Sequence, residues 1–162
     1  MIRALFAFAA FCACWLAATP PAHALVCLLG CACTVTASDI EFDDFNPLAA
    51  AEETAIGEID LHCTGLLSIG AGVTVEVLQG QWGAYAARRM RASSGDMIDY
   101  NIYTSNAHTN VWGAGAQAVQ INGGLLTLGA WSARRDMFAR LQANQAMKPG
   151  DYADTVVVRI IW

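Results

Sequence analysis

The sequence predicts an all-β sandwich, and three observations support this fold class. Short segments alternate apolar with polar residues, and this period of two places every second side chain on the same face of a strand. About seven such segments are separated by glycine or polar turns, at the spacing typical of a sandwich. Removal of an N-terminal leader of 24 residues leaves 138 of the 162 residues, which is the size of one domain.

The predicted strands follow one another from residue 33 onward. The segments that carry the alternation are 33–38, 40–45, 57–65, 72–80, 99–104, 125–131 and 154–162. Two of them place an apolar set on one face, namely Ile59, Leu61 and Cys63, and Val73, Val75 and Val77. Residues 132–145 contain enough helix formers for a helix, but their position between two strand segments favours a strand followed by a loop.

Residues 1–24 are a predicted secretory signal peptide. One basic residue, Arg3, precedes an apolar run over 4–18, and the small-residue site "AHA" at 22–24 is suited to cleavage. The apolar run is about 15 residues long, whereas a membrane-spanning helix needs about 20. We therefore expect cleavage before Leu25, export, and no membrane span in the mature chain.

The mature chain is predicted to be acidic. Loss of Arg3 leaves eight Lys and Arg residues against 14 Asp and Glu, a formal charge of −6. An excess of negative charge disfavours nucleic acids and anionic membranes as partners.

Four cysteines remain after cleavage, at Cys27, Cys31, Cys33 and Cys63. An even number in an exported chain indicates disulfides, and four cysteines allow three pairings. We predict Cys33 with Cys63, which closes a loop of about 30 residues and stabilises the fold by about 3–4 kcal/mol, and Cys27 with Cys31 by elimination. Two alternatives fit less well: acylation of Cys31 as a lipoprotein, and a zinc site, which needs spaced pairs of ligands.

Recognised catalytic motifs are not found in the sequence. The phrase "GLLSIG" at 65–70 lacks the Gly-x-Ser-x-Gly spacing of a nucleophile elbow, and there is no phosphate-binding loop. The acidic residues Asp43, Asp44, Glu52 and Glu53 lack the regular spacing of calcium ligands. We therefore expect no enzymatic activity, no metal and no cofactor.

Several phrases of the mature chain resemble the spore coat protein U family, which includes the subunits of archaic chaperone-usher pili. They are "CTV" at 33–35, "FNPL" at 45–48, "GEIDLHC" at 57–63, "RRM" at 88–90, "DYNIYTSNAHTNVWG" at 99–113 and "GDYADTVVVRI" at 150–160. The resemblance covers nearly all of 33–162, so that 25–32 is a short segment ahead of the domain. One phrase departs from the family, because "ARLQ" has Ala139 and Gln142 in the places of a glycine and a proline.

The resemblance implies an immunoglobulin-like β-sandwich that lacks its last strand. A chaperone supplies that strand first, and the N-terminal extension of a neighbouring subunit supplies it later. The implied function is that of a structural or adhesive subunit of a surface pilus, in attachment or biofilm formation. Its implied partners are a periplasmic chaperone, an outer-membrane usher and other pilus subunits, and its implied location is the periplasm and then the cell surface.

Two segments acquire specific expectations from the resemblance. Residues 99–113 are expected to form a strand, a tight turn and a second strand, with Tyr100, Ile102 and Val111 inward, instead of a sugar-binding site. Segment 154–162 is apolar on both faces except at Arg159, so burial on both sides is expected.

The eight residues 25–32 are a short donor arm, because a donor strand takes about ten. We therefore expect a subunit that accepts a strand and cannot donate one, at the tip of the fibre. The competing possibility is a shaft subunit that is cleaved further upstream and keeps 19–32 as its arm, which Pro20 and Pro21 disfavour. The alternative function is a free-standing secreted module that binds a carbohydrate or a surface through Trp82, Tyr85, Trp112 and Trp131.

Overall fold

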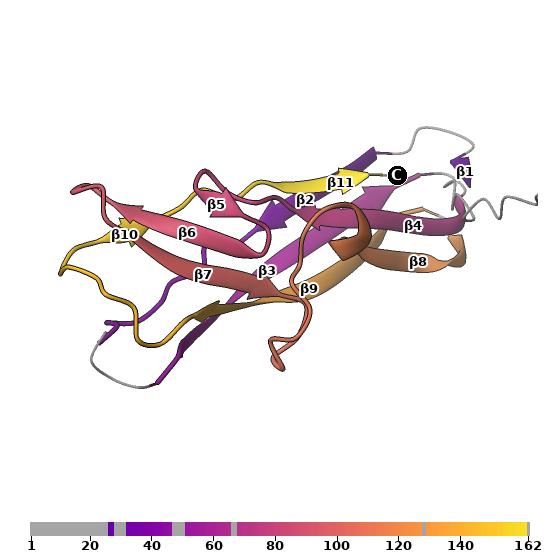
Figure 1. The fold of residues 1–162 in the computed structure, drawn as a ribbon. Helices are drawn as coiled ribbons and strands as arrows, with labels where there is room; N and C mark the ends of the chain where they lie inside the picture. Colours follow the sequence, from indigo (N-terminus) through magenta and orange to yellow (C-terminus); the bar gives the residue numbers. More distant parts are fainter. Residues whose placement is uncertain (1–25, 28–31, 47–50, 66–67, 128, 162) are drawn as a thin grey trace, which may run out of the picture.

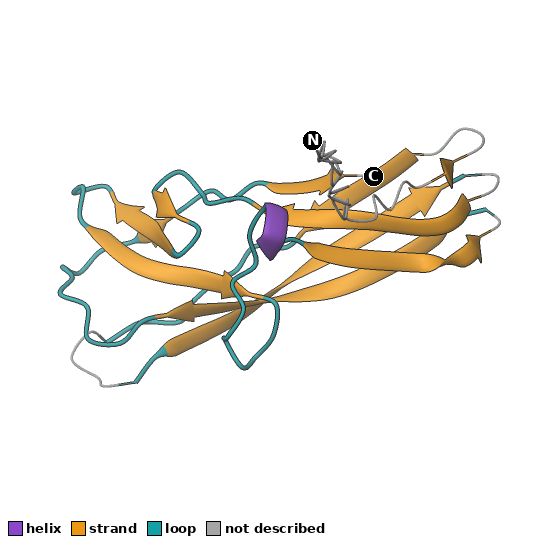
Figure 2. Cartoon of the chain, turned by 45° about the vertical axis from the view of Figure 1, so that its right-hand side comes forward, coloured by secondary structure: helices purple, strands orange, loops and turns teal. Residues whose placement is uncertain are grey.

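The structure is a computed structural model that describes residues 26–27, 32–46, 51–65, 68–127 and 129–161. Strands make up most of this part of the chain, together with one short 3-10 helix, η1 (Figures 1 and 2). The elements are β1 (Val26–Cys27), β2 (Ala32–Ala37), β3 (Glu53–Thr64), β4 (Ser68–Val77), β5 (Gly83–Ala84), β6 (Ala87–Ala92), β7 (Met97–Tyr103), η1 (Gly115–Gln117), β8 (Val119–Thr127), β9 (Trp131–Leu141), β10 (Tyr152–Ala153) and β11 (Val158–Ile161). The predicted leader, 1–24, lies outside the described residues.

The strands form two antiparallel sheets that face each other. In the first sheet β4 pairs with β8 on one edge, and with β11 and β1 on the other. The second sheet has the order β10-β6-β7-β9-β3-β2, with β5 paired to β6. The predicted all-β sandwich is therefore confirmed.

The core lies between the two sheets and is built from alternate residues of the long strands. The two predicted apolar sets are both buried there: Ile59, Leu61 and Cys63 from β3, and Val73, Val75 and Val77 from β4. Residues 132–145 form strand β9 over most of their length, followed by a loop, as predicted. Burying these apolar side chains drives the two sheets together.

Two of the predicted strands were wrong, and other strands were missed. Segment 125–131 is not one strand, because β8 ends at Thr127 and β9 begins only at Trp131. Segment 40–45 belongs to no strand, because none of the described residues pairs with it in a hydrogen-bonded ladder, although Ile40, Phe42 and Phe45 still pack against the core. Strand β6 was not predicted, because its sequence "ARRMRA" hides the alternation by placing Arg88 at a buried position.

The segment 99–113 is a strand followed by a turn that returns to the same sheet. Tyr100 and Ile102 are buried as expected, and one bridge pairs Tyr103 with Val111. Val111 is only half-buried, and the neighbouring Trp112 points into the core in its place, with 1% of its surface exposed.

Candidate functional site

The candidate site is the side of the sandwich where each sheet ends in a strand with a free edge. Among the described residues, the first sheet ends at β11, which pairs only with β4, and the second ends at β2, which pairs only with β3. The two strands lie side by side (Figure 1), but within the described residues no ladder of hydrogen bonds joins them. This seam is where the two sheets remain open.

The ladder registers show which backbone groups point into the seam. Residues of an antiparallel pair alternate between hydrogen bonding to the partner and pointing away from it. The amide of Leu78 donates to the carbonyl of Val157, so these two residues are a hydrogen-bonded pair. Because the pattern alternates along the strand, Val158 and Ile160 of β11 point their N–H and C=O groups away from β4. The amide of Ser38 donates to the carbonyl of Glu58, so Cys33 and Val35 of β2 likewise point away from β3.

The same residues turn their side chains toward the core. Val158, Ile160, Cys33 and Val35 are all half-buried and pack against the core cluster. The seam therefore offers free backbone groups and apolar side chains together, which are the two features that a further β-strand needs in order to be added.

A groove of about 300 Å³ opens at one end of the seam, between the chain after β2 and the chain before β11. Its floor contains Val77, Met90, Tyr100 and Met137, which come from both sheets. The lining is Ala37, Ser38, Asp39, Ile40, Phe42, Val77, Met90, Tyr100, Met137, Tyr152, Ala153, Asp154, Val156 and Val158. A groove of this composition is mainly apolar and can hold several side chains.

Asp154 forms the polar corner of the groove. Its Oδ1 accepts hydrogen bonds from the amides of Gln81 and Thr155 at 2.9 and 2.8 Å, and its Oδ2 accepts one from the Tyr100 hydroxyl at 2.7 Å. Gly80 allows this approach, because its φ is +86° and a Cβ there would collide with the Asp154 carboxylate. Burial, with the Asp154 hydrogen bond, raises the pKa of Tyr100, so that Tyr100 stays a neutral donor.

An arginine buried behind the floor holds the chain segments that support it. Arg88 is 0% exposed and donates through Nη2 to the carbonyls of Val77 and Trp112 at 2.8 and 2.7 Å. Its Nε donates to the carbonyl of Leu78 at 3.1 Å, and its Nη1 to Oδ1 of Asn101 at 2.6 Å. Burial lowers the pKa of Arg88. This structural role was missed from the sequence, although Arg88 begins the phrase "RRM".

The expectation that β11 is buried on both faces was wrong for the chain as described. Val157 and Ile161 on its outer face are 56% and 46% exposed, and Arg159 between them reaches Glu76 of β4. The inner face of β11 packs on the core through Val158 and Ile160, whereas its outer face remains exposed in the described part of the chain.

A disulfide joins β2 to the rest of its sheet. Cys33 and Cys63 are directly opposed in the β2–β3 register, with their Cα atoms 4.1 Å apart, and their sulfur atoms are bonded. One wall of the seam is thereby tied covalently to a core strand. The predicted bond between Cys27 and Cys31 lies outside the described residues and side chains, and it stays a prediction.

The four aromatic residues of the alternative binding module do not form one exposed surface. Trp112 is buried and its Nε1 donates to the carbonyl of Val75 at 3.0 Å. Trp131 packs against Gly123 of β8, while Arg91 lies over the ring of Trp82, 4.6 Å from its centroid. An external ligand could reach only part of this set.

Two further observations concern metal binding and membrane spans in the described part of the chain. No group of three or more His, Cys, Asp or Glu residues there could hold a metal ion. None of the helices in those same residues is long and apolar enough to cross a membrane.

The fold and the open seam define an incomplete antiparallel β-sandwich. Residues 23–159 match the family model described as the Spore Coat Protein U domain, and the chain belongs to this family. A comparison with curated proteins finds no match.

A solved structure shares this fold. A chain of the CsuC–CsuE chaperone–tip adhesion subunit pre-assembly complex, from the archaic chaperone-usher Csu pili of Acinetobacter baumannii, has a TM-score of 0.59 and 17% identity, over 83% of this chain and 40% of that one. This chain thus spans 40% of the length of that relative. A chain of a chaperone–tip adhesin complex of CFA/I fimbriae has a TM-score of 0.43 and 11% identity, over 78% of this chain and 40% of that chain.

Proposed function

We propose that this protein is a non-enzymatic subunit of a chaperone-usher surface pilus, and that it takes up a β-strand from a partner in the seam between β2 and β11. The observation that carries the proposal is the pair of facing free edges, which flank an apolar groove. An unpaired edge next to apolar side chains is an aggregation hazard, and a protein that retains one needs a strand to cover it.

Membership of the spore coat protein U domain family supports this function, because the family includes pilus subunits. We propose that the chain is exported and meets a periplasmic chaperone that covers the seam. An outer-membrane usher and a second subunit then replace the chaperone strand at the cell surface, where the pilus serves attachment and biofilm formation.

The N-terminal segment supports a place at the tip of the pilus. Residues 25–32 number eight, fewer than the roughly ten that a donor strand takes. Val26 and Cys27 pair with Ile69 and Ser68 of β4, so that part of this segment lies on the sheet of its own subunit. A subunit of this kind accepts a strand and donates none.

Co-purification from periplasm tests the function. Without a chaperone the mature chain should aggregate or self-associate, and with the chaperone it should be recovered as a one-to-one complex. A monodisperse, thermally stable monomer obtained without any partner would favour the free-standing binding module instead.

Strand exchange tests the tip position. N-terminal sequencing of the exported protein measures the arm, and we expect it to begin at Leu25. If a peptide of residues 25–32 displaced chaperone from a second subunit and formed a stable complex with it, the tip assignment would be wrong.

A further inference from the structure

The charges that line the groove have one sign. Asp39 and Asp154 are its ionisable acidic residues, and neither Lys nor Arg is among the residues that line it. In the part of the chain that the structure describes, neither carboxylate takes part in an ion pair. Asp154 is stabilised by its hydrogen bonds and by the charge of the nearby Arg88, whereas Asp39 is exposed to water.

The carboxylate of Asp154 accepts three hydrogen bonds, and none of them comes from a cation. Its Oδ1 already accepts from two amides, whereas its Oδ2 accepts only from the Tyr100 hydroxyl. The nearby cation, Arg88, acts on Asp154 through its charge but donates no hydrogen bond to it, because its guanidinium donates to the carbonyls of Val77, Leu78 and Trp112 and to Asn101. Asp154 is thus a groove-lining carboxylate that accepts no hydrogen bond from a cation, and Gly80 packs against its Oδ2.

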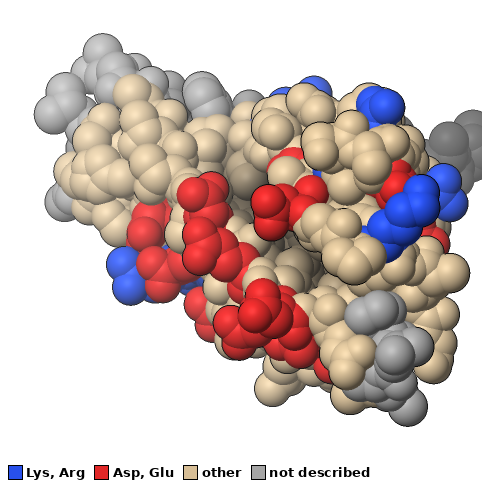
Figure 3. All heavy atoms as spheres, turned by 90° about the vertical axis from the view of Figure 1, so that its left-hand side faces the viewer, with Lys and Arg blue, Asp and Glu red and all other residues tan. Residues whose placement is uncertain are grey.

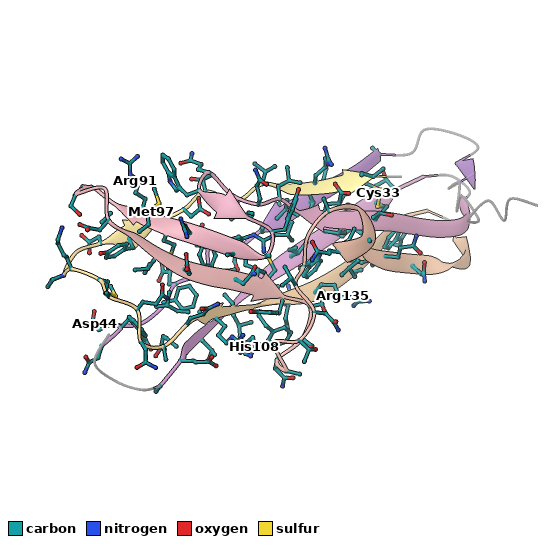
Figure 4. All side chains as sticks on the ribbon, viewed as in Figure 1. Cys33, Asp44, Arg91, Met97, His108 and Arg135 are labelled. Carbon is teal, nitrogen blue, oxygen red and sulfur yellow. A yellow bond between two sulfur atoms is a disulfide. The ribbon has the colours of Figure 1, made fainter. Side chains whose placement is uncertain are left out.

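Acidic side chains continue along the rim next to the groove. In the segment after β2, apolar residues pack on the core while the side chains between them are exposed; the exposed ones are Asp39, Glu41, Asp43 and Asp44. Figure 3 shows acidic side chains gathered around a hollow on this end of the molecule. Asp44 lies at the same end as β10 (Figure 4).

A strand laid into the groove would remove water from Asp39 and Asp154. Burying a carboxylate without a partner is costly, whereas a cation within hydrogen-bond reach offsets that cost. An uncharged aliphatic strand would therefore bind less tightly than one with a cation at this end, because it would cover the carboxylates without neutralising them. A strand with an acidic residue at this end would bind least tightly, because like charges repel.

We propose that the strand which fills this groove belongs to a different polypeptide and carries a lysine or arginine at the inward position next to Asp39 and Asp154. This proposal rests on the proposed strand-accepting function and names the chemistry of the strand. A second copy of this chain is a poor donor, because its residues 25–32 contain neither Lys nor Arg. The acidic rim also attracts a cationic strand before it docks.

Refolding with synthetic donor strands tests the proposal. The mature chain is refolded from denaturant in the presence of ten-residue peptides of alternating Val and Thr. Each peptide carries Lys, Leu or Glu at one of its inward positions, and a set of peptides covers every inward position in turn. We expect Lys at one terminal position to lower the Kd of the complex at least about tenfold relative to Leu, and Glu to raise it. The advantage of Lys should shrink between low and high NaCl concentration, because salt screens charges.

Matched variants of the chain show which carboxylates cause the preference for the Lys peptide. Asp154→Asn keeps an oxygen that can accept from Gln81 and Thr155, so the fold is retained while the charge is removed. The preference for Lys should fall in Asp154→Asn and disappear in the double variant with Asp39→Asn. Asp136→Asn, an exposed carboxylate of β9 that is not among the groove residues, should keep the full preference.

The outcomes separate this proposal from the function on which it rests. Equal affinity for the Lys and Leu peptides, or a Lys preference that survives the double variant, would overturn the cationic strand while strand acceptance stands. Tighter binding of the peptide 25–32 than of the Lys peptide would overturn the assignment to a different polypeptide. Failure of every peptide to bind would refute strand acceptance itself, and the proposal with it.

Discussion

Arg159 donates from Nε to Oε2 of Glu76 at 2.9 Å, and this pair joins the edge strand β11 to β4 on the outer face of the sheet. Only 5% of Glu76 is exposed, while the Arg159 side chain is 54% exposed. The other carboxylate oxygen, Oε1, accepts from the amide of Gly115 at 3.0 Å. The pair fixes the register of β11 from outside and leaves its inner face free for the groove.

Replacement of Glu76 by Gln should destabilise the chain by about 1–3 kcal/mol, because it removes a charge-assisted hydrogen bond to a buried carboxylate. The measurement is urea unfolding of the strand-completed protein. Glu52→Gln is the control, since Glu52 pairs with Arg140 at the exposed surface, where ion pairs contribute about 0–1 kcal/mol. Equal losses in the two variants would contradict this role of Glu76.

The contribution of Glu76 should depend on pH. The Gly115 amide and Arg159 lower the pKa of Glu76 below its ordinary value of 4.5. A lowered folded-state pKa means that the stabilisation is complete above about pH 4.5 and is lost as the pH falls through the folded-state value. The difference in Tm between wild type and Glu76→Gln should thus be constant at neutral pH and shrink in acid. A difference that grows in acid would refute this assignment.

The buried arginine should tolerate no conservative exchange. Arg88→Lys is expected to cost at least about 2 kcal/mol, because one ammonium group cannot reach the four acceptors that the guanidinium satisfies. The adjacent Arg89 pairs with Asp99 at the surface, and Arg89→Lys should change stability by less than about 1 kcal/mol. Thermal unfolding of the two variants side by side checks the contrast, and similar losses would count against the role given to Arg88.

Loss of the disulfide between Cys33 and Cys63 should sharply reduce the yield of folded protein. Replacing either cysteine by Ser is expected to cost about 2–5 kcal/mol, as is typical for a small secreted domain. Non-reducing peptide mapping of the exported chain should recover the two cysteines in one linked pair. Recovery of both as free thiols would refute the bond.

The sequence was sufficient to predict the core strands β3, β4 and β7, but it was insufficient to predict the groove or the start of β8, whose buried residue Ile121 lies ahead of the predicted segment 125–131. Ile59 and Val75 could be placed inward because alternation alone decides which face of a strand is buried. The same alternation misled at 40–45, where no neighbouring strand pairs with the segment. The environments of Arg88 and Asp154 depend on segments distant in the sequence that meet only in the folded chain, so local patterns carry no information about them.

Amide hydrogen exchange before and after the addition of a donor strand tests the central claim most directly. The claim is that a partner strand pairs with the free edges of β11 and β2. The amides that point into the seam, away from β4 and β3, are those of Val158, Ile160, Cys33 and Val35. We predict that these amides gain protection on complex formation while Arg159, which already pairs with β4, changes little. Complex formation that left the four amides exchanging as before would contradict strand addition at this seam.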